Sequence, residues 1–400
     1  MSKIFHTEYL YNGIFFLYIF FLTSTISNAG LSISLALLLL LLITLFIKKR
    51  MNIPMPNTTY LILYSIFFGG LIFVSFFSPS SQSKYFTLKY FYWTLPFWVV
   101  YLYIIEIPSF ISWGRALATS LLILMSKAFF QFFSLPLGTR ITSFFYSGNG
   151  FAAVLELVIP FLLIYFIECK KRNYWVESKL IALIIVLSLC GLLGSQSRGG
   201  IAGWCIGGVL LFLVRYCIKS YKRVSLKKTL SIIIATAAII SSIVFLGYHT
   251  FHRGYDYERT LMIQSSYEMW SDHKMFGVGF ENWGAQYKHY VSPTSKERNV
   301  PMPHNNIAYF FSATGTIGGI SYFVYVFGVL FLLICNIRKC PNNLYYQAAL
   351  WSFLAITVHG MVDSGITNKF SMQILSACLG ITFSSEYVNT SQLKKEENDF

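Results

Sequence analysis

Charged residues are scarce in this sequence. Only 12% of the 400 residues are Asp, Glu, Lys or Arg, whereas 55% are hydrophobic. A soluble domain carries about 25% charged residues, so this chain lacks the side chains to cover a water-facing surface. It also lacks a glycine-rich phosphate loop placed after a strand pattern, which leaves nucleotide hydrolysis without support.

Acidic residues are the scarcer charge, with 16 Asp and Glu against 31 Lys and Arg and a formal net charge of +15. Such a charge can indicate nucleic-acid binding. Most of the basic residues, however, lie in short loops between apolar runs, where they encode the orientation of membrane helices. We therefore expect membrane lipids as partners and no nucleic acid.

Long apolar runs make up much of the sequence in place of charged residues. Residues 31–47, 61–77 and 231–247 approach the roughly 20 residues that an α-helix needs to cross a bilayer. Because the bilayer core offers backbone groups no water, these runs must be helices rather than open strands. The expected fold class is all-α, a polytopic membrane protein with about twelve transmembrane helices.

The apolar runs divide the chain into four parts. Residues 1–248 are expected to hold nine spans, 249–305 a large loop, 306–386 three more spans and 387–400 a cytoplasmic tail. The twelve expected spans are 11–28, 30–47, 57–77, 90–106, 116–134, 150–168, 180–196, 201–214, 230–248, 306–335, 346–361 and 369–386.

Basic loops orient this bundle. With the amino terminus inside, the cytoplasmic loops receive Lys48-Lys49-Arg50, Lys170-Lys171-Arg172, Arg338-Lys339 and the basic run 215–228, as the positive-inside rule requires. None of the seven cysteines then falls in an outer loop, where an oxidising compartment would require pairs. The first span faintly resembles a signal peptide, and we expect it to be retained.

The loop 249–305 stands apart because it is long and polar. It carries six basic and six acidic residues and five of the seven histidines, and a connection of this length is usually functional. Residues 256–276 are expected to form an amphipathic helix on the membrane surface, with Asp256 as its cap and Leu261, Met262, Met269 and Trp270 on its apolar face. A turn follows at 276–280.

Two arginines on the outer side are candidates for binding an anion. Arg198 lies in the motif SQSRGG at 195–200, between two spans, where an arginine costs several kcal/mol if it reaches membrane depth. A guanidinium group holds phosphate through a planar, two-pronged contact that lysine cannot copy. Arg259 falls in the first turn of the expected surface helix, where the helix dipole disfavours a cation, so Glu258 or a lipid phosphate is expected nearby. Each arginine could instead be an ordinary interfacial charge.

His304 is the candidate general base. It closes the long loop within PMPHNN at 301–306, and its two prolines favour a fixed, extended approach to the next span. An imidazole can accept a proton near neutral pH, although a lone histidine at a helix start is more often a cap or an interfacial residue. Asp363, in the outer turn 359–365, is placed to orient His304 or an arginine.

Other polar groups give weaker signals. His249 and His252 could share a helix face, but no third ligand has the spacing of a metal site, so we expect no metal and no cofactor. Asp256 and Glu258 could serve a divalent cation. Glu156 and Lys127 lie inside expected spans, where ionisable groups suggest pairs or pathways.

In these motifs the chain resembles the O-antigen ligase family, the WaaL-type members of the wider Wzy-like polymerase and ligase superfamily. The matching features, in order, are the SQSRG turn with Arg198, Arg259 before the amphipathic stretch, Gly277-Val278-Gly279 after it, and His304-Asn305 before GTIGG at 315–319. The resemblance covers about residues 190–370, and the amino-terminal half agrees only in hydropathy.

The resemblance implies a glycosyltransferase of the GT-C type in the bacterial inner membrane, with a periplasmic active site. Such an enzyme moves a glycan from undecaprenyl diphosphate to a lipid A–core sugar in lipopolysaccharide biosynthesis, without a metal and with inversion. The resemblance assigns the base to His304 and the diphosphate to Arg198 and Arg259. Supporting roles are expected for Asn305, Asp363, Gly277 and Gly279.

Three rival functions remain open from the sequence. An O-antigen polymerase or a protein O-oligosaccharyltransferase would use the same donor and a different acceptor. A transporter or flippase for a lipid-linked sugar belongs to another class, and it predicts more polar spans and often an internal repeat. The glycan, the acceptor sugar, the linkage and the oligomeric state do not follow from the sequence.

Overall fold

A computed structural model describes residues 2–49, 54–136, 138–220, 255–363 and 365–398, and every element in these ranges is a helix. The expected all-α class is therefore confirmed for the described residues. The predicted span 230–248 and the first residues of the long loop lie outside them.

Most of the described helices follow one another after short connections. The amino-terminal helices are α1 (Ser2–Ser24), α2 (Asn28–Lys49), α3 (Thr58–Phe77), α4 (Ser81–Tyr92), α5 (Leu95–Glu106), α6 (Phe110–Ser134), α7 (Gly148–Lys171), α8 (Trp175–Gly194) and α9 (Arg198–Ser220). After the gap come α11 (Tyr255–Asp272), α12 (Trp283–Tyr290), α13 (Asn306–Lys339), α14 (Leu344–His359), the short 3₁₀ helix η1 (Gly365–Thr367) and α15 (Lys369–Asn398).

Several of these helices begin at a polar residue that satisfies the first backbone N–H groups. The side chains of Asn57, Ser147, Asn305 and Asn343 accept hydrogen bonds from the first turns of α3, α7, α13 and α14. Free N–H groups at a helix start need such partners. These caps set where each helix begins.

Seven helices in the described residues are long and apolar enough to cross a membrane. They are Asn28–Ile47, Thr58–Phe77, Phe110–Ser134, Gly148–Lys171, Trp175–Gly194, Arg198–Lys219 and Asn306–Lys339. A shorter apolar helix, Tyr9–Ser24, matches the first expected span. The expected spans 346–361 and 369–386 fall in α14 and α15, which are not among the seven, so the count of about twelve is not confirmed.

The expected span 90–106 is wrong as a single helix. Its residues are divided between α4 and α5, which are separated at Trp93 and Thr94. Pro96 follows in the first turn of α5, where its missing N–H costs no hydrogen bond. At 1.5 Å per residue, the 12 residues of α5 reach only about 18 Å.

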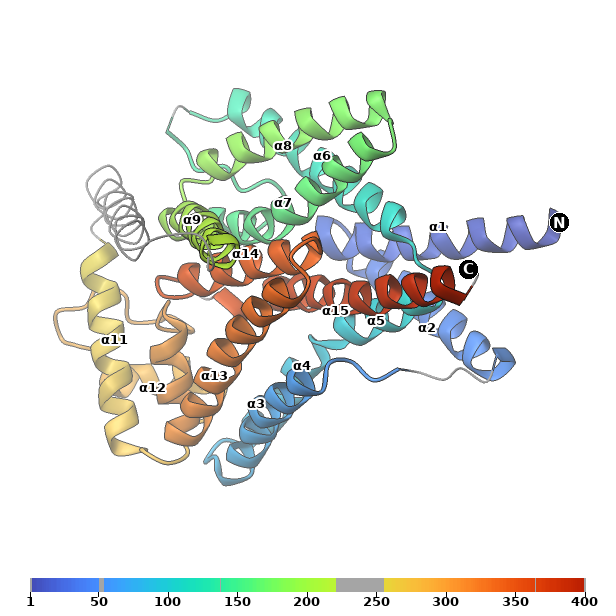
Figure 1. Ribbon diagram of the computed structural model, residues 1–400. Coiled ribbons are helices and arrows are strands. Elements are labelled where there is room, and N and C mark those ends of the chain that lie inside the picture. The colour runs from blue at the N-terminus through green and yellow to red at the C-terminus, as the bar shows by residue number, and fades with distance from the viewer. Residues whose placement is uncertain (1, 50–53, 137, 221–254, 364, 399–400) are drawn as a thin grey trace.

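Helix α7 lies between α8 and α14 (Figure 1). It packs against α8, α14, α15 and α9, while α14 also packs along α9, α15 along α5 and α13 along α3. Both ends of the chain lie away from α11 and α12, which stand together beside α13 (Figure 1). The loop 255–305 is therefore a structured cap on one end of the bundle.

The expected surface helix is α11, and it begins and ends earlier than 256–276. Asp256 lies inside its first turn and is not its cap. Leu261, Met262 and Met269 are buried, and α11 packs against α13 and α12. Its apolar face is therefore covered by protein.

A kink at Gly315 divides α13 and holds the end of the long loop. Gly315 has φ 65° and ψ −169°, a conformation that is essentially restricted to glycine. The kink frees the carbonyl groups of Ser312 and Ala313, and the N–H groups of Val278 and Gly279 donate to them at 2.9 Å each. Gly277 and Gly279 also have positive φ, so this turn needs glycine for its backbone.

We predict that Gly315→Ala lowers the free energy of unfolding by at least about 2 kcal/mol, because an L-residue is strained there and its Cβ would collide with the backbone of Met275. The melting temperature of the detergent-solubilised protein measures this loss. Gly69→Ala is the matched control, since no atom lies within 4 Å of its added Cβ. Equal melting temperatures for both variants would contradict the role of the kink.

Candidate functional site

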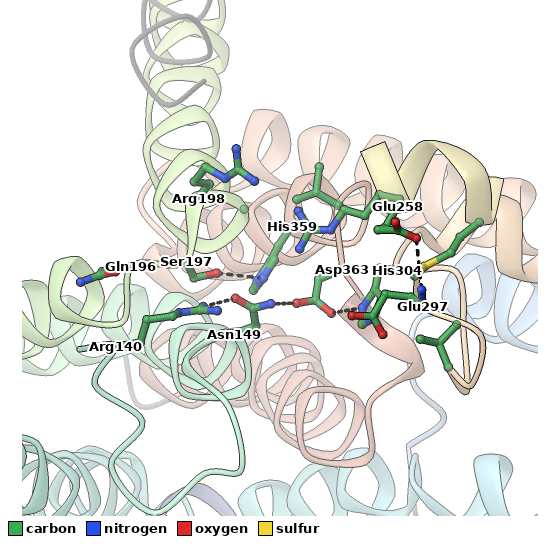
Figure 2. A pocket seen from close by; sticks show the side chains of 15 residues that line it. Arg140, Asn149, Gln196, Ser197, Arg198, Glu258, Glu297, His304, His359 and Asp363 are labelled. Atoms are coloured by element: carbon green, nitrogen blue, oxygen red, sulfur yellow. Dashed lines mark hydrogen bonds and ion pairs between the residues drawn. The ribbon is translucent and has the colours of Figure 1, made fainter. Parts of the chain in front are cut away.

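A cavity of about 370 Å³ opens where α7, α9, α11 and α14 meet the end of the long loop (Figure 2). Its lining is rich in ionisable and amide side chains. The lining residues are Arg140, Asn149, Gln196, Ser197, Arg198, Gly199, Glu258, Arg259, Met262, Glu297, Val300, His304, His359, Val362 and Asp363. Arg198, Arg259, His304 and Asp363, which the sequence singled out in four separate stretches, therefore line one cavity.

His304 is held in an uncommon backbone conformation beside Asp363. Its φ is +52°, a left-handed value that costs a non-glycine residue of order 1–3 kcal/mol. The flanking chain supplies the restraint, because the Asn306 N–H donates to the Gly360 carbonyl at 2.7 Å and the Asn305 amide donates to the Met361 carbonyl at 2.8 Å.

The imidazole of His304 pairs with a carboxylate. Its Nδ1 lies 3.1 Å from Oδ1 of Asp363, with side-chain exposures of 34% for His304 and 8% for Asp363. A buried carboxylate at one ring nitrogen fixes the ring and leaves the other nitrogen for chemistry. The predicted neighbourhood of Asp363 and His304 is therefore present in the structure.

Arg198 is the first residue of α9, and its guanidinium group makes a two-pronged contact with Asp256 of α11. Nη1 donates to Oδ2 at 2.9 Å, and Nη2 donates to Oδ1. The ion pair joins the amino-terminal ends of the two helices. Backbone N–H groups at these ends attract anions, so a carboxylate occupies a position that suits a phosphate group.

Arg259 shares the same carboxylate. Its Nη1 lies 3.8 Å from Oδ1 of Asp256, one turn earlier on α11. Glu258, one of the two partners expected near Arg259, contacts the loop at 295–297. There the Ser295 hydroxyl donates to Glu258 at 2.7 Å and the Lys296 and Glu297 N–H groups donate at 3.2 and 3.3 Å. These hydrogen bonds, that of Ser295 first, lower the pKa of Glu258.

A buried polar chain lies beneath the Arg198 turn. Glu156 of α7 contacts Nδ1 of His359 at 2.8 Å, and Nε2 of His359 lies 3.3 Å from the Ser197 hydroxyl. All three side chains are buried, and the Ser197 oxygen also accepts from the Gly200 N–H at 3.3 Å. This series of contacts fixes the start of α9 against α7 and α14. Glu156, which the sequence placed inside a span, is therefore paired with His359.

Sequence reasoning missed Arg140, Asn149 and His359. Arg140 and Asn149 lie in and after the connection between α6 and α7, which carries no motif that distinguishes them from ordinary loop residues. His359 had a usable signal, because an imidazole and the Glu156 carboxyl both lie in apolar stretches, where ionisable groups tend to pair.

Three further predicted residues, Asn305, Gly277 and Gly279, lie outside the cavity lining. Asn305 caps α13, its side-chain oxygen accepting from the Ala308 N–H at 2.9 Å. Gly277 and Gly279 form the turn against the α13 kink. His249 and His252 lie outside the described residues, and the expectation of a metal-free site stays a prediction.

Two chemical capacities meet in this cavity. Guanidinium groups at two helix starts suit an anionic ligand with phosphate-like oxygens. An imidazole paired with a carboxylate suits proton transfer from a hydroxyl group. The arrangement therefore fits a reaction in which an anionic leaving group departs and a hydroxyl attacks.

Comparison with known proteins supports this interpretation. Residues 183–323 match the sequence profile of a family described as O-antigen ligase, a shorter range than the expected 190–370. The matched segment contains Arg198, Arg259 and His304, and it ends before His359 and Asp363. No curated protein matches the chain in sequence. Over residues 183–323, the chain is thus similar to the O-antigen ligase family.

Proposed function

We propose that this protein is an O-antigen ligase of the inner membrane, which transfers a glycan from undecaprenyl diphosphate to a lipid A–core sugar on the periplasmic face. The observation that carries the proposal is the convergence of Arg198, Arg259 and the His304–Asp363 pair on one cavity. The matched family domain supports lipid-linked glycans as the substrate class.

In this proposal, Arg198 and Arg259 bind the diphosphate of the donor. The two-pronged contact of Arg198 with Asp256 has the geometry that a guanidinium group uses for phosphate. We infer that the diphosphate takes the place of the Asp256 carboxylate between the two arginines. Fixed cations at this position stabilise the negative charge that develops on the leaving group and take the role that a divalent cation has in many glycosyltransferases.

His304 accepts the proton of the acceptor hydroxyl. As the hydroxyl oxygen bonds to the anomeric carbon, the bond from that carbon to the phosphate oxygen breaks, and undecaprenyl diphosphate leaves with the electron pair. Direct displacement inverts the anomeric centre. The reaction needs no nucleotide and no ion gradient, because the bond between sugar and diphosphate supplies the free energy.

The acceptor separates this proposal from its nearest rivals. A polymerase would transfer to a second lipid-linked glycan, and a protein O-oligosaccharyltransferase would transfer to serine or threonine. Lipopolysaccharide from a deletion strain distinguishes them. For a ligase we expect rough lipopolysaccharide together with accumulated lipid-linked polymer. Core bearing a single repeat unit would indicate a polymerase. Unchanged lipopolysaccharide would contradict both the ligase and the polymerase.

We predict that His304→Ala abolishes transfer, with a loss of at least about 100-fold, because general base catalysis contributes 10²–10⁴-fold. Product formation by purified protein measures the effect, and membrane insertion should be normal. His289→Ala, an exposed histidine on α12, is the matched control. Normal turnover by His304→Ala would remove this residue from the mechanism.

We predict that Arg198→Lys lowers kcat/KM by about 100-fold or more, because lysine keeps the charge and loses the two-pronged contact. Steady-state kinetics with the lipid-linked donor measures this loss. Arg215→Lys is the control on the same helix, where Arg215 bonds to Gln347 at 2.6 Å at the far end of α9. Equal losses in both variants would contradict a specific role for Arg198.

We predict that Asp256→Asn lowers the donor KM by up to about fivefold, since the competing carboxylate is worth about 1 kcal/mol at a partly exposed site. The KM for the donor is the measurement. Asp272→Asn is the control at the other end of α11, where Asp272 accepts from the Tyr290 hydroxyl at 2.9 Å. A raised KM in Asp256→Asn would mean that the carboxylate holds Arg198 in place for the donor.

A further inference from the structure

A series of hydrogen bonds begins at His304 and leads across the cavity to Arg140 (Figure 2). Asp363 contacts His304 Nδ1 through Oδ1 at 3.1 Å and accepts from the Asn149 side-chain amide through Oδ2. The Asn149 side-chain oxygen in turn accepts from Nη2 of Arg140. Four side chains from three separate parts of the protein are therefore connected in series.

The donor and acceptor groups of these side chains determine which atom donates in each hydrogen bond. Arginine can only donate, so the Asn149 amide must present its oxygen to Arg140. Its NH₂ group then faces Asp363 and requires an acceptor there. A carboxylate that accepts at Oδ2 satisfies the ring best by accepting at Oδ1 as well, from a protonated Nδ1 of His304. In this arrangement Nε2 of His304 carries the lone pair.

We propose that Arg140 and Asn149 are positioning residues for His304, which act through Asp363 to keep the proton on Nδ1 and leave Nε2 to accept the proton of the substrate hydroxyl. This inference rests on the proposed function and extends it to two residues outside the matched segment 183–323. Arg140 and Asn149 act through Asp363, and neither is assigned a contact with the reacting atoms.

Arg140 also connects His304 to the turn that precedes Arg198. Its Nε donates to the Ser195 carbonyl at 3.0 Å, three residues before Arg198. A Cβ at Gly148 would lie 2.5 Å from the Ser195 carbonyl oxygen, so the start of α7 needs glycine to approach the same carbonyl that Arg140 contacts. The Arg140 side chain thus fixes the positions of His304 and of the turn that precedes Arg198 relative to each other.

The first test reads the tautomer directly and needs no activity. Histidine labelled with ¹⁵N in the ring is introduced into the full-length protein, and His304 is identified by the signals that His304→Ala lacks. We expect the neutral ring of His304 to carry its proton on Nδ1, and we expect Asn149→Ala to raise the share of the Nε2–H form. A proton on Nε2 in the wild type, or an unchanged spectrum in Asn149→Ala, would overturn the inference.

The second test is kinetic. We expect Asn149→Ala to lower kcat by roughly 10- to 100-fold, the loss that is typical when a residue that orients a metal-bound histidine is removed, with the donor KM changed less than about twofold. Arg140→Lys should also lower kcat, because the single nitrogen of lysine cannot occupy both the Nε and the Nη2 positions from which Arg140 donates to Ser195 and Asn149. Arg115→Lys is its control, since Arg115 makes a similar two-pronged contact with Glu177, outside the cavity.

The outcomes separate the inference from the function on which it rests. No transfer by the wild type would count against the proposed function, while the ¹⁵N spectrum still decides the tautomer. An active wild type with an unchanged kcat in Asn149→Ala contradicts the positioning role. A raised donor KM at constant kcat would mean that these residues bind the donor, and a loss of kcat matched by a loss of folded protein would mean that they only stabilise the fold.

Discussion

The Arg198–Asp256 ion pair is the contact that brings the two arginines of the cavity to one anion position. It joins the start of α9 to the start of α11, and Arg259 lies within 3.8 Å of the same carboxylate. Two guanidinium groups that lie close together repel each other, and an anion between them offsets that repulsion. The protein supplies that anion itself, and we infer that the substrate replaces it.

The rest of the site holds the Arg198–Asp256 ion pair and His304 in fixed positions relative to each other. The buried Glu156–His359–Ser197 chain holds the start of α9 from below. Arg140 bonds to the turn above and, through Asn149 and Asp363, to His304. The left-handed backbone at His304 is the local cost of presenting the imidazole to the cavity, and the network around it offsets that cost.

Much of this arrangement could be predicted from sequence. Apolar periodicity gives the all-α class, and the exceptional placement of Arg198, Arg259, His304 and Asp363 led to the cavity. The kink at Gly315 and the partner of Arg259 could not be predicted, because each depends on contacts between segments far apart in the chain. Arg140 and Asn149 resemble ordinary loop residues, and only the fold shows that they face Asp363.

Reconstitution tests the central claim most directly. Purified protein is mixed with undecaprenyl-diphosphate-linked glycan and a lipid A–core acceptor, with no nucleotide and no ion gradient, and glycan joined to the core is measured. The account predicts product from the wild type and none from His304→Ala. Translocation of the lipid-linked glycan with no transfer to the acceptor would contradict it and would indicate a transporter.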